Sequence, residues 1–211
     1  MIPSGTRVYL ASQSPRRREL LRQIGVGFEM LVLRNHRDRG PDVDEAPLAG
    51  ERPDDYVRRV CLLKAQAGWK RLAERRLPSM PVLSADTTVC LGDVIYGKPA
   101  DADDARRMLS TLSGTEHRVL TAVAIQSGTR AELAVSESLV RFRELSVQDI
   151  DAYVATGEPF DKAGAYGIQG HAATFIPEIR GSYTGIMGLP LYETAMLLER
   201  ILRQGCEVNE A

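Results

Sequence analysis

The sequence predicts an α/β protein with a mixed, twisted β-sheet and flanking helices. Over the first half of the chain, short apolar segments alternate with segments of helical periodicity, as in strand–helix–strand units. Between His117 and Leu145, two long segments of alternating apolar and polar residues predict an antiparallel hairpin. Because both kinds of connection occur, we expect parallel and antiparallel pairing in one sheet.

Length and composition are those of a globular protein. The chain has 211 residues, of which 44% are hydrophobic and 26% charged, and this composition excludes the disordered and fibrous classes. No linker-like segment divides the sequence. We therefore expect a single domain over residues 1–211, with two small lobes as the alternative internal arrangement.

Charge and cysteine content limit the partners and the compartment. The 27 basic and 28 acidic side chains leave a net charge of -1, which attracts neither nucleic acid nor an anionic membrane. An odd number of widely spaced cysteines indicates a reducing compartment rather than a disulfide framework. No apolar segment approaches the roughly 18 residues of a membrane-spanning helix, and no secretory signal is expected. These features predict a cytoplasmic protein.

The first expected elements are a strand, a helix and a second strand. Residues 7–12 (RVYLAS) have the apolar character of a buried strand. Ser14 is a suitable N-cap and Pro15 suits the first helical position, so a helix is expected from there to Gly25. Residues 28–33 (FEMLVL) predict the second strand.

The middle of the chain predicts a loop, a helix and a hairpin. Residues 34–50 are polar and contain proline and glycine, so they predict a long loop, which is usually functional or mobile at that length. Pro53 opens a helix that is expected to reach Arg75. Residues 80–97 predict a buried strand that turns at Gly92 into a short partner strand.

The remaining elements carry clear capping signals. Asp101 is the expected N-cap of a helix over residues 101–114, and Ser146 and Asp149 have the spacing of a capping box. The long hairpin is expected to turn around residues 127–129. A glycine-rich segment over residues 157–188 follows, and Pro190 opens a last helix that is expected to end at Gly205.

Arg16, Arg17 and Arg18, at the start of the first helix, are the first candidates for chemistry. A helix N-terminus already carries about half a positive charge and unpaired N–H groups, so three arginines there are unfavourable unless an anion binds. Guanidinium groups suit phosphate, and we interpret the segment as a phosphate site; a solvated helix face is the alternative. Because successive helical residues point in different directions, at most two of the three face one site, with Arg18 as the bystander.

Carboxylates are the second candidates. Asp86, in the segment SADTT, is expected at the end of an apolar strand, where it would act as a general base or hold a divalent metal; capping a turn is the alternative. The acidic cluster Asp42, Asp44 and Glu45 lies in the long loop, and on its own it would face solvent. If the loop folds back over Asp86, two carboxylates and substrate phosphates can share a magnesium ion.

Lysines are the third candidates. Lys98 lies in a turn before a proline, Lys64 lies within an apolar helical segment, and Lys162 lies in the segment FDKAG. Lysines that point inward suit a triphosphate, whereas a snorkelling side chain is the alternative for Lys64. The sequence lacks the glycine motifs of P-loop and dinucleotide-binding proteins, and its histidines and cysteines lack metal-ligand spacing.

Several of these segments occur in the order typical of one known family. They are LASQSPRRRELL, DVDE, KA, SADTT, GKP, LSGTEHRVLT, TGEPFDKAGAYGIQG and GSYTGIMGLPL. From about Val8 to Leu202, the chain resembles the Maf family of nucleoside triphosphate pyrophosphatases. The resemblance implies a two-lobed mixed α/β fold around a cleft, similar to that of inosine triphosphate pyrophosphatases. It also implies attack of water on the α-phosphate, which gives a nucleoside monophosphate and pyrophosphate.

The segments ADT and AYGIQG resemble the dTTP/UTP pyrophosphatase branch of the family rather than the branch that acts on 7-methyl-GTP. The resemblance implies that Asp86 is the proton acceptor or a metal ligand, and that a divalent cation, Mg²⁺ or Mn²⁺, is the cofactor. It associates Arg16, Thr87 and Gln169 with the choice of base. A glutamine offers the donor and the acceptor that uracil or thymine requires, and a simple loop hydrogen bond is the alternative. The remaining phosphate and metal contacts are assigned to Ser12, Arg17, Glu45, Lys64 and Lys98.

Two positions depart from the family pattern. Leu63 stands before Lys64 where family members commonly carry an acidic residue. The loop between Leu33 and Asp42 is longer than usual, so the choice between Asp44 and Glu45 as the metal ligand of the loop stays open.

Three functions compete at this point. The first is metal-dependent hydrolysis of dTTP, UTP or modified pyrimidine triphosphates, by a monomer or a homodimer. The second is a non-catalytic nucleotide-sensing protein in septum formation or cell division, which would bind nucleotides without turnover. The third is nucleic-acid binding through the arginines, and the near-zero net charge and scarce aromatic residues argue against it.

Overall fold

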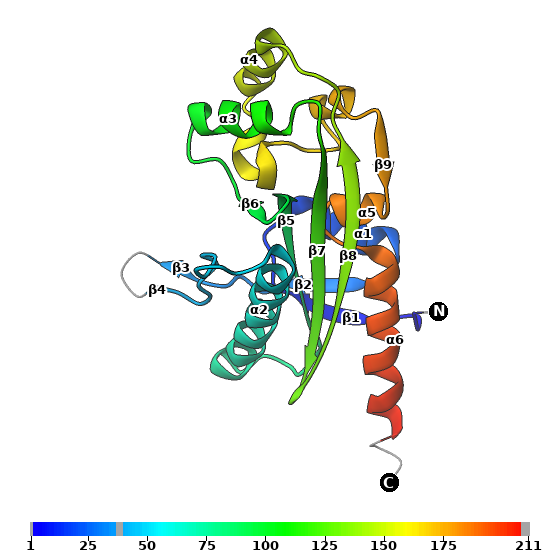
Figure 1. Cartoon of the computed structure of the whole chain (residues 1–211). Helices are drawn as coiled ribbons and strands as arrows, with labels where there is room; N and C mark the ends of the chain where they lie inside the picture. The colour runs from blue at the N-terminus through cyan, green and yellow to red at the C-terminus, as the bar shows by residue number, and fades with distance from the viewer. Residues whose placement is uncertain (1, 37–39, 208–211) are drawn as a thin grey trace.

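We obtained a computed structural model of the chain that describes residues 2–36 and 40–207. Its main sheet (Figure 1) has the strand order β2-β1-β5-β7-β8-β9, with β6 also paired to β5. The strands are β1 (Arg7–Leu10), β2 (Gly27–Met30), β5 (Val82–Leu91), β6 (Val94–Tyr96), β7 (Glu116–Ser127), β8 (Arg130–Arg141) and β9 (Glu178–Arg180). β1 runs parallel to β2 and β5, and the other pairs of this sheet are antiparallel. The mixed α/β fold predicted from the sequence is therefore confirmed.

The described α-helices are α1 (Pro15–Gln23), α2 (Pro53–Arg75), α3 (Ala102–Leu112), α4 (Val147–Ala155), α5 (Tyr183–Ile186) and α6 (Leu191–Glu207). The first four begin where the sequence predicts, α5 was not expected, and α6 begins one residue after Pro190 and ends two residues beyond Gly205. Ser14 and Asp101 each accept a hydrogen bond from a backbone N–H of the first helical turn, and Ser146 and Asp149 form the expected capping box. None of the described helices combines the length and the apolar character needed to cross a membrane.

Three segments differ from the sequence expectation. The second strand ends at Met30 rather than at residue 33, because its partner strand ends at Leu10 and no neighbour continues the pairing. The expected loop over residues 34–50 contains a short ribbon of β3 (Asn35–His36) and β4 (Gly40–Pro41), and residues 37–39 lie outside the described residues. The glycine-rich segment contains β9, α5 and three 3₁₀ helices, η1 (Glu158–Asp161), η2 (Ala163–Ala165) and η3 (His171–Phe175).

Strand alternation divides the core between the two faces of the sheet. On one face, Cys61 and Ala65 of α2 pack with Ala122 and Ala124 of β7. On the other face, α1 and α6 pack with Val123 of β7 and its neighbours. Side chains two residues apart share a face of a strand, so one strand supplies both layers. The two long helices accordingly lie on different sides of the long strands (Figure 1).

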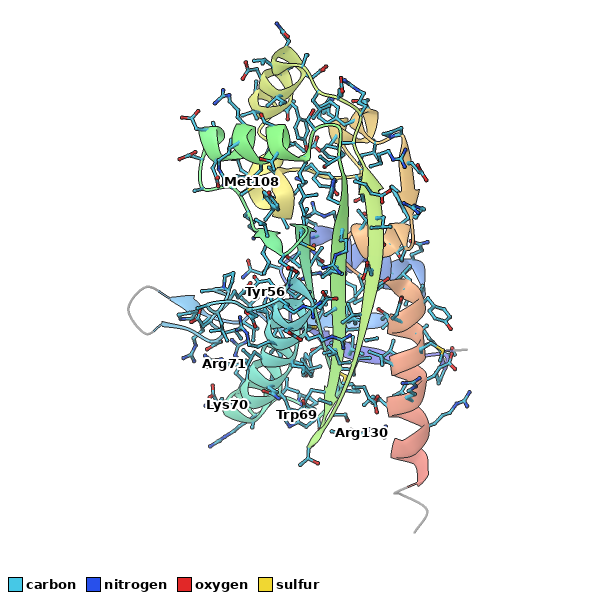
Figure 2. All side chains as sticks on the ribbon, in the orientation of Figure 1. Tyr56, Trp69, Lys70, Arg71, Met108 and Arg130 are labelled. Atoms are coloured by element: carbon cyan, nitrogen blue, oxygen red, sulfur yellow. The ribbon has the colours of Figure 1, made fainter. Side chains whose placement is uncertain are left out.

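A further apolar cluster lies near one end of the long strands, beside α3 and α4 (Figure 1). It combines Val119 of β7 with Met108 of α3, Tyr153 of α4 and Tyr166 from the glycine-rich segment. Figure 2 shows Met108 in this region, well away from the lower part of α2. Because β7 contributes to this cluster and to those beside α2 and α6, the clusters share one sheet.

Candidate active site

A polar cavity of about 1190 Å³ opens beside the middle of β5. β1 pairs with β5 only as far as Leu83, and β6 pairs with it only from Val89 onward. On this edge, residues 84–88 of β5 have no strand partner within the described part of the chain, and the cavity lies along the gap. All the site residues chosen from the sequence line the cavity: Ser12, Arg16, Arg17, Glu45, Lys64, Asp86, Thr87, Lys98 and Gln169.

Asp86 lies in the middle of β5 and not at the strand end that the sequence predicted. The strand continues past it because Asp86 and the residues up to Cys90 keep their antiparallel pairing with β7. Asp86 is only 6% exposed. This burial raises the pKa of its carboxyl above the usual 3.8, although the charge of Lys64 acts in the opposite direction. A buried carboxylate in a cavity suits a proton acceptor.

Lys64 connects two carboxylates that lie far apart in the sequence. Its Nζ donates to Oδ1 of Asp86 and to Oε2 of Glu45, each at 2.7 Å. The side chain thus points into the cavity, and the snorkelling alternative is wrong. Tyr56 lies nearby on α2 (Figure 2), and its hydroxyl donates to the backbone carbonyl of Glu45 at 3.1 Å. Two side chains of α2 therefore hold this part of the loop at the cavity.

The other acidic residues of the loop are engaged elsewhere. Asp42 pairs with Arg71 of α2, whose hydrogen bonds lower the pKa of the Asp42 carboxyl. Asp44 accepts a hydrogen bond from the backbone N–H of Ala46 at 2.9 Å. Asp42 and Asp44 are both absent from the cavity wall. The loop therefore brings Glu45, rather than Asp44, to Asp86.

Arg17 is held by three acceptors on the cavity wall. Its Nε donates to the carbonyl of Gly188 at 2.7 Å, Nη1 donates to Oγ of Ser12 at 3.1 Å, and Nη2 donates to Oγ1 of Thr87 at 3.3 Å. Burial lowers the pKa of Arg17, and the nearby Asp86 charge opposes this effect. The guanidinium is thus fixed beside the acidic group before any ligand arrives.

Arg16 and Lys98 are cations of the cavity with weaker attachments. The carboxylate paired with Arg16 belongs to Asp161, and the two groups are 3.9 Å apart. Within residues 2–36 and 40–207, the Lys98 ammonium makes no hydrogen bond or ion pair. Arg18 does not line the cavity, which confirms that only two of the three arginines face it. Arg16 and Lys98 are therefore available to an anionic ligand.

Gln169 lies in a tight turn over residues 167–170. The turn is closed by the Gly170 N–H, which donates to the carbonyl of Gly167 at 3.1 Å. Ile168 and Gln169 both line the cavity, and Ile168 is also buried in the core. In the described part of the chain the Gln169 amide makes no hydrogen bond, so the alternative of a simple loop hydrogen bond is not observed. The amide retains a donor and an acceptor for a ligand.

Several cavity residues were not chosen from the sequence. Glu158 and Asp161 of η1 line the cavity, and Gly188 supplies the carbonyl that accepts from Arg17. Lys162, one of the lysine candidates, lines the cavity beside them. The segment TGEPFDKAG shows that charged residues lie at the start of the glycine-rich segment. It does not show that a 3₁₀ helix forms there and brings these side chains to the cavity.

Two of the described carboxylates are suited to a divalent cation. No cluster of three or more histidine, cysteine or acidic side chains with metal-site geometry occurs among the described residues. Glu45 and Asp86 nevertheless meet at Lys64. Mg²⁺ commonly takes one or two protein carboxylates and completes its shell with phosphates and water. The donor set fits a cation that binds together with a phosphate ligand.

These features define a mixed α/β protein whose polar cavity brings buried carboxylate and cationic side chains together. The family model described as Maf-like protein matches residues 7–201. The chain therefore belongs to the Maf family. A relative from Aromatoleum aromaticum is 62% identical over 94% of this chain and 97% of its own length, and it is named dTTP/UTP pyrophosphatase.

Other comparisons agree with the family. Relatives from Ralstonia nicotianae and Nitrosomonas europaea carry the same name, dTTP/UTP pyrophosphatase. The first is 62% identical over 90% of this chain and 92% of its own length. The second is 54% identical over 93% of this chain and 95% of its own length. Among solved structures, the Ham1 protein of Staphylococcus aureus matches 65% of this chain and 72% of its own, with 12% identity and a TM-score of 0.43, which is too distant to support a conclusion.

Proposed function

We propose that this chain hydrolyses dTTP and UTP to the nucleoside monophosphate and pyrophosphate, in the cytoplasm. The observation that carries the proposal is the contact of buried Asp86 with Lys64, in a cavity that Arg16, Arg17 and Lys98 also line. A carboxylate can accept a proton from water, and several cations can bind a triphosphate. The names of the relatives support the choice of nucleotide.

In the proposed reaction, Asp86 accepts a proton from the water that attacks the α-phosphate. Burial raises the pKa of Asp86, so its carboxylate is a stronger base than that of an exposed aspartate. Lys64 donates to Oδ1. Among the described residues Oδ2 has no hydrogen bond, and it is the oxygen left for the water.

The cations have separate tasks in this proposal. Arg17 is already fixed by its three acceptors, so it binds phosphate without losing further rotamer freedom. Ser12 and Lys98 complete the phosphate contacts. Arg16 and Gln169, with Thr87, contact the base, and the glutamine amide complements the carbonyl and imide N–H groups of uracil and thymine.

We propose Mg²⁺ or Mn²⁺ as the cofactor, with Glu45 and Asp86 as its candidate protein ligands. When bound, such a cation stabilises the charge that develops on the phosphoryl oxygens. Lys64 keeps the two carboxylates close together beforehand, because its charge offsets their mutual repulsion.

The test is hydrolysis of dTTP and UTP in ¹⁸O-labelled water with Mg²⁺ or Mn²⁺. Ion-exchange chromatography is expected to show the monophosphate and pyrophosphate, and mass spectrometry is expected to find the label in the monophosphate. Release of orthophosphate, or label in pyrophosphate, would contradict attack at the α-phosphate. Nucleotide binding without any turnover would instead favour the non-catalytic sensor.

A further inference from the structure

The Glu158 carboxylate is fully engaged by the chain itself. Its Oε1 accepts a hydrogen bond from the Tyr153 hydroxyl at 3.0 Å, and its Oε2 accepts one from the backbone N–H of His171 at 3.0 Å. The Tyr153 hydroxyl in turn accepts from the backbone N–H of Gly167 at 3.2 Å. Glu158 is therefore connected to both ends of the turn that carries Gln169, directly at one end and through Tyr153 at the other.

The turn also packs directly on Glu158 and its neighbour Lys162. A Cβ atom at Gly170 would lie 2.1 Å from Oε1 of Glu158, and one at Gly167 would lie 2.6 Å from Cε of Lys162. A larger residue at either position would displace the Glu158 carboxylate or the Lys162 side chain. Lys162 Nζ donates to the backbone carbonyl of Glu158 at 2.6 Å, which fixes η1 beneath the turn.

Tyr153 gives this arrangement a rigid support. Its ring is 2% exposed and packs edge-on against Phe175 of η3, with 5.3 Å between the ring centroids. Burial and the hydrogen bond to Glu158 raise the pKa of Tyr153, so the hydroxyl keeps its proton and remains a donor. The hydroxyl position is thus set by α4 and the apolar core, rather than by the turn.

We propose that Glu158 is a positioning residue for base selection, which holds the 167–170 turn so that Gln169 meets the base in one fixed geometry. The inference rests on the proposed hydrolysis of dTTP and UTP. Uracil presents a carbonyl oxygen and an imide N–H where cytosine presents an amino group and a ring nitrogen that accepts, so an amide distinguishes the two bases only if its orientation is fixed. Glu158 acts through Tyr153 and the His171 N–H, without touching the substrate.

The experiment compares kcat and KM for UTP and CTP in Glu158→Ala and in the parent protein. We expect the UTP-to-CTP ratio of kcat/KM to fall by at least about tenfold, mainly through a higher KM for UTP. The reason is that a displaced Gln169 amide no longer forms its hydrogen bonds to uracil. A variant that is only less stable loses activity toward both nucleotides equally, so its ratio does not move. Asp151→Ala is the matched control, because Asp151 is a carboxylate of α4 that pairs with Arg106 and not with the turn.

Two further variants test the hydrogen bonds themselves. Glu158→Gln retains an oxygen for the His171 N–H, but its amide N–H faces the Tyr153 hydroxyl, which then has to accept instead of donate, so we expect it to restore the ratio only in part. Tyr153→Phe removes the acceptor of the Gly167 N–H, so we expect it to lower the ratio in the same direction as Glu158→Ala. Should Glu158→Ala fail to fold, Tyr153→Phe decides the question, and an unchanged ratio in that variant overturns the proposal.

Calorimetric binding of UTP and CTP in EDTA separates this inference from the proposed function. Selective UTP binding that Glu158→Ala loses supports the positioning role even if the parent protein hydrolyses neither nucleotide. A Glu158→Ala variant that keeps the parental selectivity in both assays overturns the positioning role and leaves the hydrolysis standing. A parent protein without preference for UTP in either assay overturns it as well.

Discussion

The charges of Asp86 and Lys64 stabilise each other, because both side chains are largely buried. Their 2.7 Å ion pair lies in a medium less polar than water, where an unpaired charge is costly. Glu45 adds a second carboxylate to the same ammonium group. Lys64 therefore offsets two negative charges at once, and its charge favours the ionised form of Asp86.

Asp86→Asn tests the proposed base directly. We expect kcat for UTP to fall by about 10²–10⁴-fold, because the amide cannot accept the proton, while the fold persists since its oxygen still accepts from Lys64. In the parent protein, activity is expected to fall as the pH decreases through the pKa of Asp86, which burial places above 3.8. Steady-state kinetics and circular dichroism measure both effects. Asp44→Asn is the control outside the cavity, and full turnover in Asp86→Asn would place the base elsewhere.

The buried side chain of His117 makes the free energy of unfolding depend on pH. It is 1% exposed, its Nε2 lies 2.8 Å from the Tyr166 hydroxyl, and its buried Nδ1 has no partner among the described residues. Burial lowers the pKa of His117 from 6.5 to about 4. Between pH 6.5 and about 4, His117 binds a proton in the unfolded chain but not in the folded protein. Its neutral form therefore contributes its full stabilisation only above pH 6.5, and this contribution decreases as the pH falls.

We therefore expect the free energy of unfolding to decrease by up to about 3 kcal/mol from this residue as the pH falls through that window. Urea denaturation at several pH values measures the change. His117→Gln is expected to flatten this part of the profile. Identical pH profiles for the parent and His117→Gln would contradict the argument.

At the scale of elements, α2 packs closely against the sheet at Gly68. A Cβ atom at Gly68 would lie 2.7 Å from Cγ1 of Val82 and 3.3 Å from Cδ2 of Leu31. Both neighbours are buried, so neither can move into solvent. Figure 2 shows the adjacent Trp69 on the lower part of α2, far from Tyr56 at the cavity end of the same helix. The close contact thus fixes the helix that carries Lys64.

Gly68→Ala is expected to destabilise the protein by about 1–2 kcal/mol. Overpacking against Val82 costs about 1–3 kcal/mol, and the better helix propensity of alanine offsets up to about 1 kcal/mol of this. Chemical denaturation gives the value. Gln66→Ala, on the exposed side of α2, is the control with little expected change. If Val82→Ala does not relieve the effect of Gly68→Ala in the double variant, the proposed contact is not its cause.

The sequence predicted those features that depend on near neighbours. The caps at Ser14 and Asp101 need only the first turn of a helix, and the long hairpin needs only alternation and its turn. The prediction that Asp86 lies at the end of its strand was wrong, because the length of β5 depends on its pairing with β7, a distant segment. Resemblance to a family identified nine of the residues that line the cavity, but the hydrogen bonds of Glu158 depend on a 3₁₀ helix that no local pattern indicates.

At the scale of the whole molecule, long strands pass through more than one apolar cluster. β7 supplies Val119 to the cluster beside α3 and α4, and Val123 to the cluster beside α6. If β7 separates from one cluster, the apolar side chains of the other cluster are exposed to solvent as well. The single domain expected over residues 1–211 stays a prediction, and this sharing of strands is its physical basis.

We expect one cooperative unfolding transition for the whole chain. Trp69 is the only tryptophan, so its fluorescence reports on the part of the core beside α2. Hydrogen exchange of α3 and α4, measured by mass spectrometry, reports on the apolar cluster beside these two helices. The two denaturation curves are expected to coincide, whereas separate midpoints would show that the two ends unfold independently.

The location of Asp86 and Gln169 on different segments has an evolutionary consequence. The acidic group belongs to a central strand whose hydrogen-bond ladder fixes it, whereas the glutamine belongs to a short surface turn. Under the roles proposed for Gln169 and Asp86, mutations in that turn change which nucleotide is accepted and leave the hydrolytic chemistry intact. A lineage that inherits this architecture can diversify its substrates through a few substitutions, without passing through inactive ancestors.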